Sequence, residues 1–192
     1  MIAIVKYNAG NIRSVQNSVE RLGYKCTITD DPDEIRSAER VILPGVGEAG
    51  SAMKHLKERG LDELIKNLQQ PVLGICLGLQ LLCNYSEEGD TECLGVFDTV
   101  VRKLPPLGKV PHMGWNNFIS VSGRLLEGIK PPEDVYYVHS YCTVKNIHTT
   151  AEAFYIIPFS AAMEKDNFFA TQFHPEKSAG VGDRIMKNFL EL

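Results

Sequence analysis

A cysteine between two glycines is the strongest indication of chemistry in this chain. Gly74-Ile75-Cys76-Leu77-Gly78 has the pattern Gly-x-nucleophile-x-Gly, with cysteine in the place of serine. The pattern joins an apolar run to a helical one, so the thiol is expected at a helix N-terminus, where free amides favour the reactive thiolate. The Leu77 amide would point to where an oxyanion forms. A buried structural cysteine in a glycine-rich turn is the alternative interpretation.

A histidine and a carboxylate lie close together near the end of the chain. His174 and Glu176 are two residues apart in Gln172-Phe173-His174-Pro175-Glu176, and strand periodicity places both side chains on one side. An imidazole oriented by a carboxylate is the general base that a thiol nucleophile needs. A solvated surface loop is the alternative, but the combination with Cys76 favours a catalytic triad.

A third motif is a glycine-rich turn after an apolar run. Pro44-Gly45-Val46-Gly47 follows residues 41–43, and open parallel sheets bind ligands at the carboxyl ends of their strands. Its amides are candidates to hold a substrate backbone or to complete an oxyanion hole. A phosphate-binding turn is the alternative, but the Lys and Ser/Thr of a P-loop are missing.

The remaining cysteines and two of the histidines lack such a context. Core thiols and solvated imidazoles are the favoured interpretations for Cys26, Cys83, Cys93, Cys142, His55 and His148. The odd number of cysteines and the lack of a secretory signal indicate reduced thiols in the cytoplasm. No Cys-x-x-Cys or His-x-x-x-His spacing occurs, so we expect neither a metal nor a cofactor.

Hydrophobic periodicity predicts the elements that position these motifs. Short apolar runs predict strands at residues 2–7, 26–28, 41–43 and 72–75. Helical patterns follow: one with Ile12, Val15, Val19 and Leu22, one over 53–68, and one over 77–83. This alternation implies right-handed βαβ units and an α/β fold with an open, doubly wound, mostly parallel sheet.

The second half of the chain has a different texture. Runs at residues 96–101, 115–121, 135–144 and 168–173 predict strands separated by turns, which suggests antiparallel additions to the sheet. A closing helix contains Ile185 and Phe189. The conformation of residues 147–158 stays open.

Length and composition restrict the class of protein. The chain has 192 residues, 44% hydrophobic and 23% charged, which fits one globular domain over residues 1–192. Twenty basic and 24 acidic residues give a net charge of −4, which argues against a non-specific nucleic-acid binder. No run approaches the ~18 apolar residues that a membrane span requires.

Taken together and in this order, the motifs resemble those of class I glutamine amidotransferases. The matching stretches are Pro44–Gly47, Gly74–Gln80 and Gln172–Lys177. Two more, Tyr7–Val15 and Lys109–Asn116, are similar to the members of this family that serve histidine biosynthesis.

The resemblance implies that a triad hydrolyses the side-chain amide of glutamine. Cys76 would be the nucleophile, His174 the general base and acid, and Glu176 the residue that orients His174. The resemblance also implies an oxyanion and substrate site made of Gly45, Val46, Gly47, Leu77, Gln80, Glu88, Ser140 and Tyr141. The implied partner interface contains Asn11, Lys109, His112, Trp115 and Asn116.

The implied partner is a (β/α)8-barrel cyclase subunit in a heterodimer. It would use the ammonia to make imidazole glycerol phosphate and aminoimidazole carboxamide ribotide. The resemblance implies no cofactor, nucleic acid or membrane. The same chemistry for another acceptor pathway is an alternative, against which Asn8–Asn11 and Lys109–Asn116 speak. A free-standing γ-glutamyl hydrolase or cysteine peptidase is another. A regulatory subunit with an inactive site is a third, against which the complete triad speaks.

Overall fold

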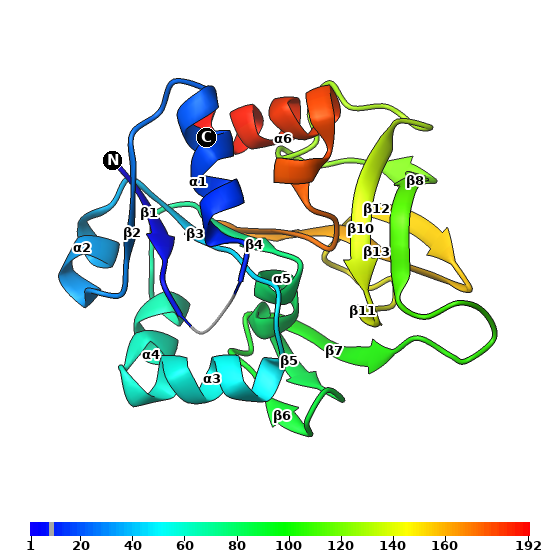
Figure 1. The fold of residues 1–192 in the computed structure, drawn as a ribbon, viewed down its shortest axis with the longest axis horizontal. Helices are drawn as coiled ribbons and strands as arrows, with labels where there is room; N and C mark the ends of the chain where they lie inside the picture. Colours follow the sequence, from blue (N-terminus) through cyan, green and yellow to red (C-terminus); the bar gives the residue numbers. More distant parts are fainter. Residues whose placement is uncertain (8–9) are drawn as a thin grey trace.

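A mixed β-sheet forms the centre of the molecule in the computed structural model, which describes residues 1–7 and 10–192 (Figure 1). Asn8 and Ala9, half of the predicted turn Asn8–Asn11, lie outside the described residues. Among the described residues the strands lie in the order β2-β1-β3-β4-β14-β13-β12-β9.

The first five of these strands are parallel and the last three are added antiparallel. The parallel strands are β1 (Ile2–Val5), β2 (Cys26–Thr29), β3 (Arg40–Leu43), β4 (Val72–Ile75) and β14 (Phe168–Thr171). The antiparallel strands are β13 (Ile157–Lys165), β12 (Thr149–Tyr155) and β9 (Ser120–Val121). The predicted α/β fold, an open and mostly parallel sheet with antiparallel additions, is confirmed.

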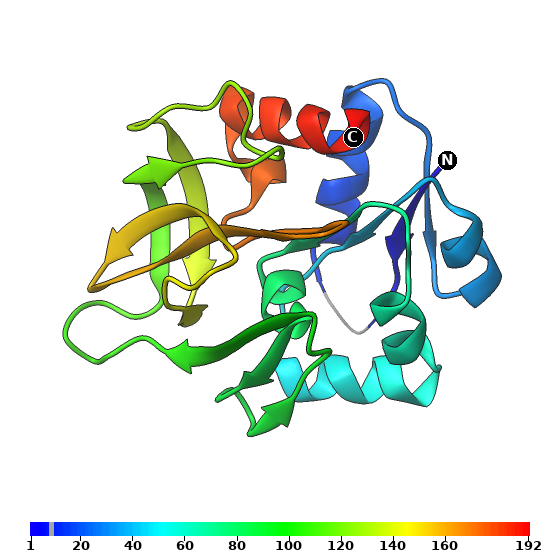
Figure 2. The same ribbon diagram turned by 180° about the vertical axis from the view of Figure 1, so that it is seen from behind.

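Helices cover both faces of the sheet (Figures 1 and 2). One face carries α1 (Ile12–Arg21) and α6 (Ala179–Glu191), and the other carries α2 (Pro32–Ser37), α3 (Ala49–Glu58), α4 (Leu61–Lys66) and α5 (Leu77–Leu82). Strand β1 supplies both cores, because Ile2 and Ile4 pack with the first group and Ala3 and Val5 with the second. A strand buried on both faces needs a continuous apolar run, which is the pattern its sequence has.

The second half of the chain departs from the predicted strands in several places. The predicted strand 135–144 is broken at Ser140 into β10 (Asp134–His139), which pairs with β8 (His112–Asn117), and β11 (Tyr141–Thr143), which pairs with β7 (Phe97–Lys103). The predicted strand 115–121 is divided between β8 and β9. Cys83 begins β5 (Cys83–Ser86), which pairs with β6 (Thr91–Glu92) and β7, instead of ending the helix.

Strands β3, β4 and β14 are parallel neighbours, so their carboxyl ends meet at one edge of the sheet. The three motifs found in the sequence lie at the carboxyl ends of these three strands. The fold therefore brings together segments that are far apart in the chain. In the part of the chain that the structure describes, no helix has the length and apolar character needed to cross a membrane.

Candidate active site

Cys76 occupies a strained turn between β4 and α5. Its backbone has φ 52° and ψ −100°, a conformation that costs a non-glycine residue free energy and that clusters at functional sites. The two flanking glycines make the turn possible. A Cβ at Gly78 would collide with the Leu43 carbonyl, and a Cβ at Gly74 would lie 2.7 Å from the Gly78 backbone. The Cys76 amide donates to the Thr171 carbonyl at 2.7 Å, which fixes the turn to β14.

His174 and Glu176 lie beside this cysteine. Nδ1 of His174 is 2.8 Å from Oε1 of Glu176, and both side chains are buried. Burial lowers the pKa of His174, but a negative charge on Cys76 and the contacts with Cys76 and Glu176 raise it more, to about 10. The surroundings therefore favour the protonated form of the His174 imidazole. Nε2 of His174 has no hydrogen-bond partner among the described residues, so it remains available to transfer a proton.

Asn11 supports the carboxylate from the other side. The resemblance implies a place for it in the partner interface, and in the structure its Nδ2 donates to Oε1 of Glu176 at 2.6 Å. Asn11 takes the left-handed φ of 65° immediately before α1, which asparagine tolerates better than most residues. Its position after β1, at the same sheet edge as the other motifs, was the signal for this contact.

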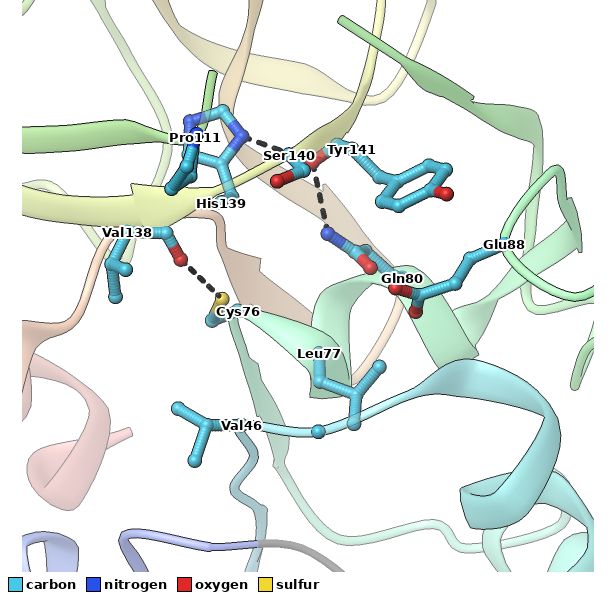
Figure 3. A pocket seen from close by; sticks show the side chains of 11 residues that line it. Val46, Cys76, Leu77, Gln80, Glu88, Pro111, Val138, His139, Ser140 and Tyr141 are labelled. Carbon is cyan, nitrogen blue, oxygen red and sulfur yellow. Dashed lines mark hydrogen bonds between the residues drawn. The ribbon is translucent and has the colours of Figure 1, made fainter. Parts of the chain in front are cut away.

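A cavity of about 270 Å³ opens beside Cys76 (Figure 3). Its lining includes seven of the expected oxyanion and substrate residues: Val46, Gly47, Leu77, Gln80, Glu88, Ser140 and Tyr141. Gln80 donates from Nε2 to the Tyr141 carbonyl at 3.0 Å. Oε2 of Glu88 accepts from the Ala49 amide at 2.9 Å, and burial raises the pKa of this carboxyl group. The cavity thus has a nucleophile and an acidic group, and its small size suits an amino acid.

The turn after β3 has a defined orientation that affects the oxyanion site. The Leu77 amide donates to the Gly45 carbonyl at 3.3 Å, and the Gly10 amide donates to the Val46 carbonyl at 2.9 Å. The Tyr7 hydroxyl donates to the Pro44 carbonyl. Gly45 does not line the cavity. The Leu77 amide, which was expected to bind the oxyanion, donates its hydrogen bond to the Gly45 carbonyl instead.

Comparison with known proteins adds the family. Residues 3–192 match the model of the family Glutamine amidotransferase class-I. The chain belongs to this family. The amidotransferase is 56% identical over 194 residues to "Imidazole glycerol phosphate synthase subunit HisH" of Bacteroides fragilis, with 100% of this chain and 99% of the relative covered. The protein of the same name from Escherichia coli is 44% identical over 194 residues, with the same coverage.

Solved structures agree with the fold of the amidotransferase. A crystal structure of a glutamine amidotransferase has a TM-score of 0.78 at 18% identity, and the match covers 99% of this chain and 97% of that one. At this identity the similarity concerns the fold alone.

The amidotransferase exposes only some of the residues expected at a partner interface. Lys109 is exposed and Trp115 is 56% exposed, whereas Asn116 is half-buried. His112 is only 3% exposed, and its ring is stacked on Tyr155 at 4.0 Å and on Tyr137 at 4.9 Å. The imidazole therefore lies inside the protein and does not reach the surface, contrary to its expected place in the interface.

His139, which lines the cavity, forms a buried pair with His112. Nδ1 of His112 is 2.9 Å from Nε2 of His139, and Nδ1 of His139 is 2.9 Å from the Tyr141 carbonyl. A carbonyl only accepts, so Nδ1 of His139 carries the proton and Nε2 accepts from His112. Burial lowers the pKa of His112 to about 4; burial and the neighbouring His112 lower that of His139 to about 3.

Acidification is expected to destabilise the amidotransferase through this pair. Between about pH 6.5 and the folded pKa values of about 4 and about 3, the unfolded chain binds protons that the folded chain excludes. The contribution of the two neutral imidazoles to the free energy of unfolding is complete above the unfolded pKa. It decreases as the pH falls, by up to about 1 kcal/mol per pH unit for each imidazole. Urea denaturation across this range measures the effect.

His112→Phe keeps an aromatic ring between the two tyrosines and removes one titrating group, so it should make the dependence of stability on pH less steep. His55→Phe on α3 is the control, since His55 is outside the pair. An equal pH dependence in His112→Phe and the unsubstituted protein would contradict the assignment.

Proposed function

We propose that this amidotransferase is the glutaminase subunit of an imidazole glycerol phosphate synthase and hydrolyses glutamine to glutamate and ammonia. The observation that carries the proposal is the contact among Cys76, His174 and Glu176, of which Cys76 lines the small cavity. The name shared by relatives up to 56% identical over their full length supports the choice of synthase.

The proposed reaction begins with attack of the Cys76 sulfur on the side-chain carbonyl carbon of glutamine. The carbonyl electron pair moves to oxygen, and His174 protonates the nitrogen, which leaves as ammonia when the C–N bond breaks. Glu176 holds the imidazole in the orientation for both proton transfers. Water activated by His174 then hydrolyses the γ-glutamyl thioester and restores the cysteine.

The cavity supplies groups for the rest of the substrate. The acidic Glu88 suits the α-ammonium group of glutamine, and the backbone around Ser140 and Tyr141 offers polar groups to the α-carboxylate and the amide. Gln80 holds the Tyr141 carbonyl in place by its hydrogen bond. The oxyanion would be bound by the amides of Leu77 and Val46.

A second chain would consume the ammonia. The proposed partner is the (β/α)8-barrel cyclase subunit, which would combine ammonia with a ribulosyl nucleotide intermediate. The exposed Met113 and Trp115 on β8, with the neighbouring Lys109, suit such an interface, because aromatic residues and methionine are enriched where proteins meet.

The test is an assay of glutamate and imidazole glycerol phosphate for the chain mixed with a barrel cyclase subunit and its ribulosyl substrate. We expect glutamate and cyclised product in equal amounts. Hydrolysis of γ-glutamyl peptides by the chain alone, without turnover of glutamine in the mixture, would indicate a free-standing hydrolase instead. If a synthase for another acceptor stimulated glutamate release and the cyclase did not, the proposed pathway would be rejected.

A further inference from the structure

Gln172 contacts the sulfur of Cys76, although the reaction described above gives it no part. It directly follows β14 and is fully buried, with 0% of its surface exposed. Its Nε2 is 3.7 Å from Sγ of Cys76, within the range of a hydrogen bond to sulfur. Its backbone amide donates to the Ala161 carbonyl at 2.8 Å, which anchors the residue to β13. Two successive residues thus contact Cys76: Thr171 binds its backbone amide, and Gln172 binds its sulfur.

The side chain of Gln172 carries an energetic cost. Its Oε1 is buried and has no hydrogen-bond partner among the described residues. A buried polar atom left unpaired destabilises a protein, and an apolar side chain of the same length would avoid this cost. The contact of Nε2 with Cys76 is therefore the property that distinguishes glutamine from an apolar residue here.

The other neighbours of the sulfur define what this contact does. The Val138 carbonyl is also 3.7 Å from Sγ (Figure 3), but a carbonyl can only accept a hydrogen bond from the neutral thiol. An amide N–H donates, and donation to a charged acceptor is stronger than to a neutral one. Gln172 thus favours the thiolate, whereas Val138 favours the thiol.

We infer that Gln172 is a catalytic residue, whose side-chain amide donates a hydrogen bond to the Cys76 sulfur and stabilises negative charge on it. The role within the reaction rests on the proposed glutaminase function. Negative charge is on the sulfur before it attacks glutamine and returns to it in the last step. There, water oxygen bonds to the thioester carbon, His174 takes the proton, and the C–S bond breaks with its electron pair left on sulfur. Gln172 stabilises the charge at both points.

The experiment compares the reactivity of Cys76 with and without this donor. Gln172→Met keeps an unbranched side chain of similar size and removes the amide. Alkylation of Cys76 by iodoacetamide at neutral pH should slow by about 10-fold or more, the effect of losing a hydrogen bond to a charged group. Thiolate absorbance should fall in parallel, and glutamine turnover with the partner should decrease by a similar factor.

The other thiols do not obscure the measurement. Burial raises the pKa of Cys26, Cys83, Cys93 and Cys142, so they stay protonated at neutral pH, and the signal of Cys76→Ser is subtracted. Gln70→Met is the matched control, because the Gln70 amide donates to the carbonyls of Ile35 and Arg36, away from the site. Its alkylation rate should be unchanged.

A second variant tests whether position 172 requires a hydrogen-bond donor or only a polar side chain. Gln172→Glu keeps size and polarity but brings a carboxylate to the sulfur, and alkylation should be slower than in Gln172→Met. Recovery of the rate in Gln172→Glu, or an unchanged rate in Gln172→Met, would overturn the inference. If alkylation depends on Gln172 but the unsubstituted protein with its partner does not turn over glutamine, the inference stands and the proposed function fails.

Discussion

Replacing Cys76 with serine is expected to lower glutamine hydrolysis by about 10,000-fold or more, as the loss of a triad nucleophile does in other hydrolases. The side chain sits in the turn between β4 and α5, where serine has nearly the same size and can keep the contact with the Val138 carbonyl. The loss should therefore come from chemistry and not from unfolding. Glutamate release with the cyclase present measures the rate, and thermal unfolding measures the stability.

The same variant tests whether this chain only produces ammonia while the partner carries out the synthesis. With abundant ammonium salt, synthesis by the partner should continue in Cys76→Ser, since this chain would only supply ammonia. Cys83→Ser is a matched control: Cys83 is also buried, and its Sγ donates to the Leu79 carbonyl at 3.4 Å, a bond that serine can make. Glutamate release at the unsubstituted rate in Cys76→Ser, or loss of ammonium-dependent product, would contradict this prediction.

The isolated chain is expected to hydrolyse glutamine at least about 100-fold more slowly than the chain with its loaded partner, because the loss of even one oxyanion donor costs about 100- to 1000-fold in rate. In the structure the Leu77 amide donates to the Gly45 carbonyl. This carbonyl and the Val46 amide belong to one peptide plane. Rotation of that plane would release Leu77 and bring the Val46 amide to the oxyanion, so a single movement would supply two donors.

Glycine at position 45 favours this rotation, because it borders the rotating peptide plane and has no side chain to oppose the movement. A Cβ at Gly45 would collide with the Tyr7 hydroxyl and lie 3.0 Å from Cβ of Leu77. Gly47 has φ 148°, a backbone angle that residues other than glycine rarely adopt. Binding of the loaded partner would have to favour the rotated form.

Three conditions measure this activation: the chain alone, the chain with empty cyclase, and the chain with cyclase and its ribulosyl ligand. We expect the rate of glutamate release to rise steeply only in the third. Full activity of the isolated chain, unchanged by either addition, would exclude the rotation as a switch.

The turn that holds Cys76 could be predicted because local sequence determines it. Glycine is required at positions 74 and 78 because the backbone of α5 lies too close to β3 and β4 for a side chain. The buried strand before Cys76 is recognisable as a continuous apolar run. Helix α2 also has a recognisable start in the sequence, although its few apolar residues give no helical periodicity. Asp31 accepts hydrogen bonds from the amides of Asp33 and Glu34, and proline follows it, which is a regular helix start.

Other features depend on contacts between distant residues. The β12–β13 hairpin, in the segment left open, turns at Ile156 with φ 65°, a conformation for which a β-branched residue gives no signal. The break at Ser140 arises because β10 and β11 join different sheets. The contacts of Asn11 with Glu176 and of Gln172 with Cys76 join residues 165 and 96 positions apart, so neither motif alone could reveal them.

The place of β14 in the sheet determines when the site around Cys76 can assemble during synthesis of the chain. β14 lies between β4 and β13; its last residue, Thr171, accepts a hydrogen bond from the Cys76 amide, and Gln172 directly after it contacts the Cys76 sulfur. A growing chain that has not yet reached residue 168 has no partner for that side of β4, and it lacks Gln172, His174 and Glu176. Such a nascent chain cannot consume glutamine, but it exposes an apolar strand edge that can pair with other chains. Completion of the sheet therefore covers this strand edge and brings Cys76, His174 and Glu176 together in one folding event.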